Sequence, residues 1–139
     1  MPDDPIKAQG VVLKRGDGAS PEVFTDIAKI VGFTGPNGTA TVRDNTTLAD
    51  QGKVKAMGLV DEGQMTLECL LVPGDIGQAG LRADRLNGTL RNFKLVLTDA
   101  AQTTLTFSAL VLSHPISGNS GDTVHMSVTL EISGIVDWS

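Results

Sequence analysis

The sequence GQMTLECLLVPGDIGQAGLRADRLNGTLRNFKLVLT, residues 63–98, predicts a strand, a short helix and a second strand. Apolar and polar residues alternate in residues 64–72 before the run becomes fully apolar, which is typical of a strand with one buried face. The residues predicted to face the core on this strand are Met65, Leu67, Cys69 and Leu71. The second strand repeats the pattern with Phe93, Leu95 and Leu97 on one side.

The segment between these strands has the signals of a helix over residues 75–87. Pro73-Gly74 ends the strand, and Asp75 lies three residues before Gln78, which is the spacing of a capping box. Asn87-Gly88 is a typical helix C-terminus. Small and apolar residues at helical spacing predict one narrow buried stripe, formed by Ile76, Ala79, Gly80, Ala83 and Leu86. One helix cannot bury such a stripe alone, so it must lie on a sheet or fill the end of one.

The rest of the chain contains further strand patterns separated by turns. The clearest is residues 123–133, in which the predicted inward residues are Val124, Met126, Val128, Leu130 and Ile132. Residues 103–113 alternate in the same way, and the two runs predict an antiparallel hairpin. Residues 22–33 favour a strand with a bulge near Ala28. In total, about seven strands and one helix predict a mainly β fold, a two-layer β-sandwich or open barrel with the helix packed on its side.

The chain is predicted to be a single domain, residues 1–139, with three segments outside its core. Residues 1–9 form an N-terminal arm, and residues 134–139 form a short C-terminal tail. Residues 45–62 form a long loop whose apolar residues follow neither a strand nor a helix period. Long loops in compact domains are usually functional or disordered. Two interpretations remain open: the loop folds back on the domain, or it becomes ordered against another subunit.

Composition excludes several classes of function. Aromatic content is 4%, with one Trp and no Tyr, which disfavours sites that stack sugars or bases on rings. The net charge of −5 disfavours nucleic-acid binding, which depends on cations at phosphates. A single cysteine cannot form an internal disulfide. The N-terminus lacks the apolar region of a signal peptide, and no apolar run reaches the ~20 residues of a membrane span, so we expect a chain that folds in a reducing cytoplasm.

The sequence contains no motif that predicts catalysis, a metal or a cofactor. His114 and His125 are the only histidines, and neither belongs to a metal-binding spacing. Gly74, Gly77 and Gly80 do not match a phosphate-binding fingerprint, and close packing of a helix on a sheet explains them better. Cys69 is interpreted as a small buried hydrophobic residue rather than a reactive thiol. The chain is therefore predicted not to be an enzyme, and an absent active site beside a semi-apolar loop favours an assembly protein.

The stretch VPGDIGQAGLRADRLNG, residues 72–88, resembles the strand, Pro-Gly turn, helix and Asn-Gly unit of the major tail tube protein of long, non-contractile phage tails. The order of the arm, bulged strand, long loop and final hairpin is also similar. The resemblance implies a β-sandwich that forms hexameric rings, which stack into a tube around a lumen. The lumen holds the tape-measure protein and later passes DNA without specific binding. Tail terminator and distal tail proteins are further implied partners, and the implied location is the virion tail, assembled in the host cytoplasm.

The resemblance also implies roles for particular residues. The long loop would supply contacts between subunits, through Asn45, Leu48, Lys53, Val54, Lys55, Met57 and Leu59. The N-terminal arm and the C-terminal tail would add contacts through Asp3, Asp4, Ile6 and Trp138. Six copies at −5 each would give a ring a formal charge of −30. Candidates for acidic residues on the lumen wall, where they would repel DNA, are Asp26, Asp44, Glu68 and Glu131.

Two alternatives compete with this interpretation. The first alternative is a tube of the type VI secretion kind, or another tail component such as a terminator. Such a protein would also have a β-sandwich fold and assemble into rings. A monomeric β-sandwich that binds a small ligand belongs to a different class, and it predicts a monomer with a concave pocket. The low aromatic content counts against that second alternative.

Overall fold

A computed structural model describes residues 5–139. In chain order the elements are β1 (Val12–Gly16), β2 (Phe24–Asp26), β3 (Ile30–Thr34), β4 (Thr39–Asp44), β5 (Lys55–Asp61), β6 (Gln64–Leu70), α1 (Ile76–Asn87), β7 (Arg91–Val96), β8 (Thr104–Ser113), β9 (Ile116–Ser117) and β10 (His125–Trp138). In this part of the chain, no helix has the length and apolar character needed to cross a membrane.

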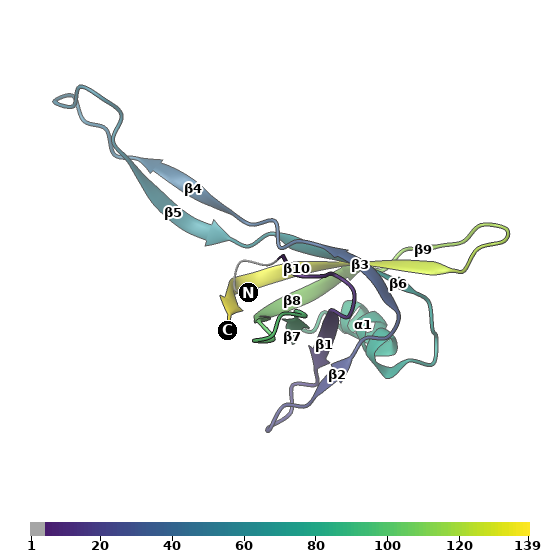
Figure 1. Ribbon diagram of the computed structural model, residues 1–139. Helices are drawn as coiled ribbons and strands as arrows, with labels where there is room; N and C mark the ends of the chain where they lie inside the picture. The colour runs from purple at the N-terminus through teal and green to yellow at the C-terminus, as the bar shows by residue number, and fades with distance from the viewer. Residues whose placement is uncertain (1–4) are drawn as a thin grey trace.

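The body is one antiparallel sheet in the order β2-β1-β7-β8-β10-β6-β3, with β9 paired to β10. The helix α1 lies beside this sheet, and β4 and β5 form a separate two-stranded sheet that projects from the body (Figure 1). The predicted mainly β fold with one helix at its side is confirmed. The sheet is continuous and does not close into a barrel.

The core forms where the sequence alternates. The predicted inward residues of β6, β8 and β10 are buried in one cluster that includes Leu67, Phe107 and Leu130. The predicted pairing of the last two long strands is confirmed, with register shifts near Thr129 and beyond Ser133. Val124 was predicted to face the core but is exposed, because β10 begins one residue later.

The segment of residues 22–33 turns a corner instead of forming one bulged strand. Its first half is β2, which pairs with β1 at one edge of the sheet. Its second half is β3, which pairs with β6 at the other edge. Four residue steps from Asp26 to Ile30 span at most roughly 14 Å, so the two edges of the sheet must lie close together. Between them Ile27 enters the core, and Lys29 adopts a positive φ of 60°.

The helix has the predicted ends but a different buried face. Asp75 is the N-cap and accepts a hydrogen bond from the Gln78 N–H, and Gly88 ends the helix in the left-handed conformation. The predicted stripe is wrong at three of its five residues, since Ala83 is exposed, Ile76 is 73% exposed and Leu86 is 82% exposed. The face that packs on the sheet consists of Gly77, Gln78, Leu81 and Asp84. Two of these four residues, Gln78 and Asp84, are polar, so the helical spacing of apolar residues did not predict that they are buried.

Gln78 joins the helix to the corner between β2 and β3. Its amide nitrogen donates to the carbonyls of Ala28 (2.8 Å) and Leu70 (2.9 Å), and its amide oxygen accepts from the Val72 N–H (2.9 Å). The Ala28 N–H donates to the Asp75 carboxylate (3.2 Å). Gln78 is fully buried, and these bonds satisfy backbone groups that the irregular corner leaves without strand partners.

Close packing explains two of the glycines in the helix. A side chain at Gly77 would meet the Asp26 carbonyl oxygen at 2.6 Å and the Ile27 Cα at 2.9 Å. A side chain at Gly80 would meet the Arg15 guanidinium at 2.6 Å. The prediction that these glycines serve helix packing therefore agrees with the structure at both positions.

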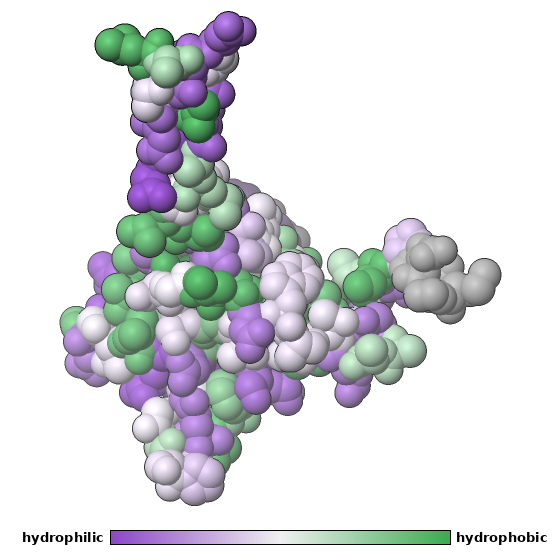
Figure 2. All heavy atoms as spheres, turned by 90° about the vertical axis from the view of Figure 1, so that its left-hand side faces the viewer, coloured by the Kyte–Doolittle hydropathy of each residue, from purple (hydrophilic) through white to green (hydrophobic). Residues whose placement is uncertain are grey.

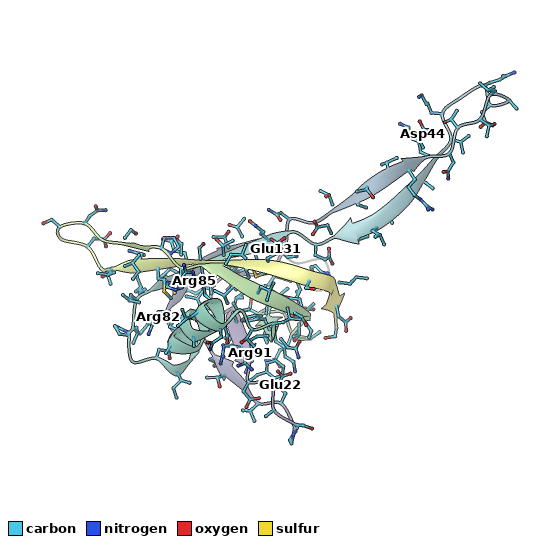
Figure 3. The ribbon with its side chains drawn as sticks, turned by 180° about the vertical axis from the view of Figure 1, so that it is seen from behind. Glu22, Asp44, Arg82, Arg85, Arg91 and Glu131 are labelled. Carbon is cyan, nitrogen blue, oxygen red and sulfur yellow. The ribbon has the colours of Figure 1, made fainter. Side chains whose placement is uncertain are left out.

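A buried carboxylate links the other end of the helix to the sheet. Asp84 is 2% exposed and accepts hydrogen bonds from Arg15 on β1 (2.6 and 2.8 Å) and from Arg91 on β7 (3.1 Å). The bond to Asp84 raises the pKa of Arg15 further above its ordinary value. Arg91 also donates to the carbonyl of Asp17, in the turn that carries Glu22 (Figure 3). Because Asp84 is buried and binds arginines from two strands, it fixes the helix against β1 and β7.

Cys69 lies in the core of β6, as predicted. Its side chain is fully buried, and burial raises the pKa of the thiol above its ordinary value. A thiol needs a lowered pKa and access to solvent to react readily. Cys69 therefore packs as a small apolar residue.

The Gln78 network can be tested by replacing Gln78 with Leu, which has a similar volume. The Gln78→Leu variant should lose roughly 3 kcal/mol or more of unfolding free energy, because three buried backbone groups lose their partners. Urea denaturation measured by circular dichroism gives this value. The exposed Gln51→Leu should shift stability by less than ~0.5 kcal/mol. Equal midpoints for wild type and Gln78→Leu would contradict the role assigned to this amide.

Candidate assembly surface

The most exposed part of the described chain is the hairpin formed by β4 and β5, residues 39–61. From here on, this hairpin is called the arm, and it is distinct from the N-terminal arm predicted for residues 1–9. Its register runs from Thr39 opposite Asp61 to Asp44 opposite Lys55, with one irregularity between Ala40 and Val42. The arm projects away from the sheet and the helix (Figure 1). The predicted loop of residues 45–62 therefore differs from the structure in its second half, because residues 55–61 are strand β5. Only residues 45–54 form the tip.

Hydrogen bonds within the tip hold its shape. The Asn45 N–H donates to the Val54 carbonyl (2.8 Å), and the Val54 N–H donates to the Thr46 hydroxyl (2.8 Å). The Asp44 carboxylate accepts from Thr46, which lowers the pKa of Asp44 below its ordinary value, and it lies 3.7 Å from the Lys53 ammonium. These bonds are local to the arm, so they order the tip without attaching it to the body.

Large apolar side chains are exposed along the arm. Leu48 at the tip is fully exposed, Met57 is 68% exposed and Leu59 is 88% exposed. Figure 2 shows the arm as a narrow column on which hydrophobic and hydrophilic residues are interspersed. The loop residues predicted to contact other subunits all lie on this arm and are exposed. They are Asn45, Leu48, Lys53, Val54, Lys55, Met57 and Leu59.

One exposed apolar residue of the arm was not singled out by the sequence. Val42 lies on β4 directly opposite Met57, and it is as exposed as that residue. The signal was present, because Val42 belongs to the extended segment of residues 39–44. It was missed because the pattern of a strand does not identify its partner, and the pairing of β4 with β5 appears only in the structure.

The predicted contact residues near the chain ends lie apart from the arm's tip. Ile6 is partly exposed in the segment before β1, where the Lys7 carbonyl accepts a hydrogen bond from Thr98 (2.6 Å). Trp138 is exposed at the end of β10, opposite Leu105. Asp3 and Asp4 lie outside the described residues.

The four acidic candidates fall in three places. Glu68 on β6 and Glu131 on β10 each lie between two buried residues of their strand, so both belong to the outer face of the sheet. Asp26 lies at the sheet edge and pairs with Lys14 (3.2 Å). Asp44 lies on the arm, far from Glu131 (Figure 3). The structure therefore places Glu68 and Glu131 on the same face of two paired strands, without bringing them into contact.

The outer face of the sheet has two halves of opposite charge. Between Glu68 and Glu131 the outward residues are hydroxylated, with Ser127 opposite Glu68 and Thr66 opposite Thr129. Glu131 itself lies opposite Gln64 of β6 and Leu110 of β8. On the other half, Lys94 of β7 lies opposite Lys14 of β1, and its ammonium lies 4.2 Å from the Phe24 ring centroid. One oxygen of Glu131, Oε2, is buried and has no hydrogen-bond partner among the described residues. The β6–β10 half therefore carries two carboxylates, whereas the β1–β7 half carries Lys14, which is paired with Asp26, and Lys94.

No arrangement of catalytic or metal-binding residues is found in the described part of the chain. Within residues 5–139, no group of three or more His, Cys, Asp or Glu side chains is placed to hold a metal ion. One open hollow on the arm and another between residues 8–11 and 30–33 are lined by no His, Cys, Asp or Glu side chain. The features that stand out are instead surfaces: an apolar arm and a sheet face divided by charge.

Comparison with solved structures shows that this fold occurs in tubes of several kinds. The chain is 14% identical to a chain in the tail of an empty gene transfer agent particle, computed with C6 symmetry, with 97% of this chain and 99% of that one covered and a TM-score of 0.75. It is 18% identical to the SPP1 tail tube, with 96% and 78% covered and a TM-score of 0.73. It is 17% identical to a chain of the PVC sheath-tube complex of an extracellular contractile injection system, with 99% and 93% covered and a TM-score of 0.73.

The family is shown by the sequence itself. A search of curated protein sequences finds no match. A family model described as lambda phage tail tube protein matches residues 13–139, which is almost the whole chain. The match includes the helix, the arm and every strand of the sheet except the first residue of β1. The chain therefore belongs to the lambda phage tail tube protein family, and its role is that of a structural tail tube component.

Proposed function

We propose that six copies of this chain form a ring, that the rings stack through their arms, and that the resulting tube conducts DNA. The observation that supports this proposal most strongly is the arm itself, a two-stranded hairpin with large exposed apolar side chains. An isolated hairpin of two strands is at best marginally stable in water. The arm therefore gains its stability when another copy covers it.

The energy available from this contact is large enough to support assembly. Burying one Leu, Met or Val side chain is worth about 1.5–3 kcal/mol. Each arm exposes four such side chains that another copy could bury: Val42, Leu48, Met57 and Leu59. Each subunit of a ring repeats this contact. Part of that gain is lost to the ordering of the arm and of the subunits. The remainder, summed over six subunits, favours stacked rings over free ones.

The acidic half of the outer sheet face is the proposed lumen wall. Glu68 and Glu131 lie about 13 Å apart along β6 and β10, and the hydroxyl side chains of Thr66, Ser127 and Thr129 lie between them. Carboxylates repel phosphates over a Debye length of ~10 Å at 0.1 M salt. A wall of this kind lets DNA move without sticking. The same lumen would hold the tape-measure protein before DNA passes.

The tube would end at further tail proteins. A chain in the structure of the anti-feeding prophage tube-terminating cap has a similar fold, with 14% identity and a TM-score of 0.72. This likeness also supports a second candidate function, that of a terminator. Electron microscopy separates the two, because a tube subunit polymerises into long tubes and a terminator stops at single rings. In either case the protein acts mechanically, in the virion tail, after assembly in the host cytoplasm.

The role of the arm can be tested with two matched pairs of substitutions. Met57→Ser with Leu59→Ser removes apolar side chains from the arm, and Ile76→Ser with Leu86→Ser removes equally exposed ones from the helix. The arm pair should reduce tube formation at least tenfold, since it removes roughly 3 kcal/mol or more of apolar burial per contact. The helix pair should assemble as wild type does. Negative-stain electron microscopy and sedimentation measure tube formation, and circular dichroism checks folding. Tubes from the arm pair at the wild-type yield would rule out this role.

The lumen assignment can be tested by reversing charge on the sheet face. Tubes of Glu68→Lys with Glu131→Lys, polymerised with a short DNA duplex, should retain the duplex at low salt and release it as salt rises. Tubes of Glu68→Gln with Glu131→Gln should retain little, because no cation faces the phosphates. Co-sedimentation of labelled duplex, with nuclease treatment to remove DNA bound outside, gives the readout. Nuclease-sensitive binding alone would place this face on the exterior of the tube.

A further inference from the structure

A groove lies beside β3, between that strand and the segment before β1. It has a volume of about 580 Å³ and is lined by residues 8–11 and 30–33, called here the β3 groove. Its lining side chains are uncharged, and they include Val11, Ile30 and Phe33. Val31, on the same strand, is 55% exposed. The groove is therefore an apolar hollow open to solvent.

The β3 groove differs in charge from hollows elsewhere on the described surface. The hollow near Thr98 is lined by Lys7 and Asp99, the one on the basic half of the sheet by Lys14 and Lys94, and the one beside Thr66 by Glu68. A partner for the β3 groove must present apolar side chains and few charges. The middle of the arm meets this requirement, since Arg43 is the one charged residue between Ala40 and Asp44 on β4, and residues 56–60 of β5 are uncharged.

The groove also contains an unpaired strand edge. β3 ends the sheet order and pairs with β6 on one side, and within residues 5–139 no strand pairs with its other side. In the arm, β4 and β5 pair with each other, so each of them also has a free edge in the described chain. Exposed edges bind other strands through backbone hydrogen bonds. The arm and the groove thus match in both their side chains and their backbone.

The arm cannot reach the groove of its own chain. β3 ends at Thr34 and β4 begins at Thr39, so the β3 groove lies at the root of the arm, and the arm extends away from it (Figure 1). The occupant must come from another copy. A contact between two different surfaces of identical chains repeats from copy to copy and gives an open polymer unless it closes into a ring.

We propose that the arm of a second copy docks in the β3 groove, with Met57 and Leu59 against Val31 and its neighbours. This inference rests on the proposed function, in which arms join copies of the chain, and it adds the surface that receives them. The docking would cover apolar residues on both sides at once. It would also add a backbone edge to β3.

Site-specific cross-linking tests this docking. Cys69 is buried, so cysteines introduced at exposed positions react selectively. Tagged Val31→Cys protein and untagged Leu59→Cys protein are mixed, assembled and treated with a short bis-maleimide. A tagged heterodimer on a denaturing gel is expected, at least tenfold above the yield from Leu86→Cys mixed with Leu59→Cys. Leu86 is a matched control because it is 82% exposed on the helix.

Each outcome decides between the alternatives. Tubes that give no Val31–Leu59 adduct, or as much Leu86–Leu59 adduct, would overturn the docking and leave the proposed tube intact. Wild-type protein that forms no tubes would overturn the proposed function and the docking with it.

If the cysteine variants do not assemble, substitutions that introduce opposite charges at the two positions test the docking instead. Val31→Glu and Leu59→Lys should each block assembly while the monomer stays folded, and the double variant should restore it because the two charges meet. Failure of the double variant beside two folded single variants would count against the docking.

Discussion

The fold depends on one buried amide at the place where the sheet turns back on itself. Gln78 bonds to Ala28, Leu70 and Val72, so a single side chain holds the β2–β3 corner, the end of β6 and the start of the helix. Without these bonds the corner would bury backbone groups with no partners, at a cost of about 1–3 kcal/mol each. The corner also fixes where β3 joins the edge of the sheet. Because β4 follows β3 directly in the chain, the corner also fixes the base of the arm.

The molecule is divided into a body with a packed apolar core and an arm without one. In the body, Asp84 binds two arginines and the inward residues of β6, β8 and β10 form one core. The arm has no core, and its apolar residues face solvent. In the proposed tube, neighbouring subunits would cover the arm, and Glu68 and Glu131 would lie on the lumen wall.

Much of the fold was predictable because it depends on local patterns. Alternation along residues 64–72, 103–113 and 123–133 identified the strands and most of the core. The Asp75 cap and Gly88 identified both ends of the helix, since capping involves residues within one turn. The resemblance to tail tube proteins was confirmed by the family match over residues 13–139. The loop residues proposed as contacts between subunits are exposed on the arm, and those contacts remain predictions.

The sequence by itself determined which segments extend, where the helix begins and ends, and to which family the chain belongs. Only the tertiary structure decided which helix face is buried, because Gln78 and Asp84 find partners up to 69 residues away and a polar residue looks exposed in any local pattern. It also split residues 22–33 between the two edges of one sheet and made residues 39–61 a projecting hairpin. Strand pairing is a contact between distant residues, and the period of a strand does not name its partner.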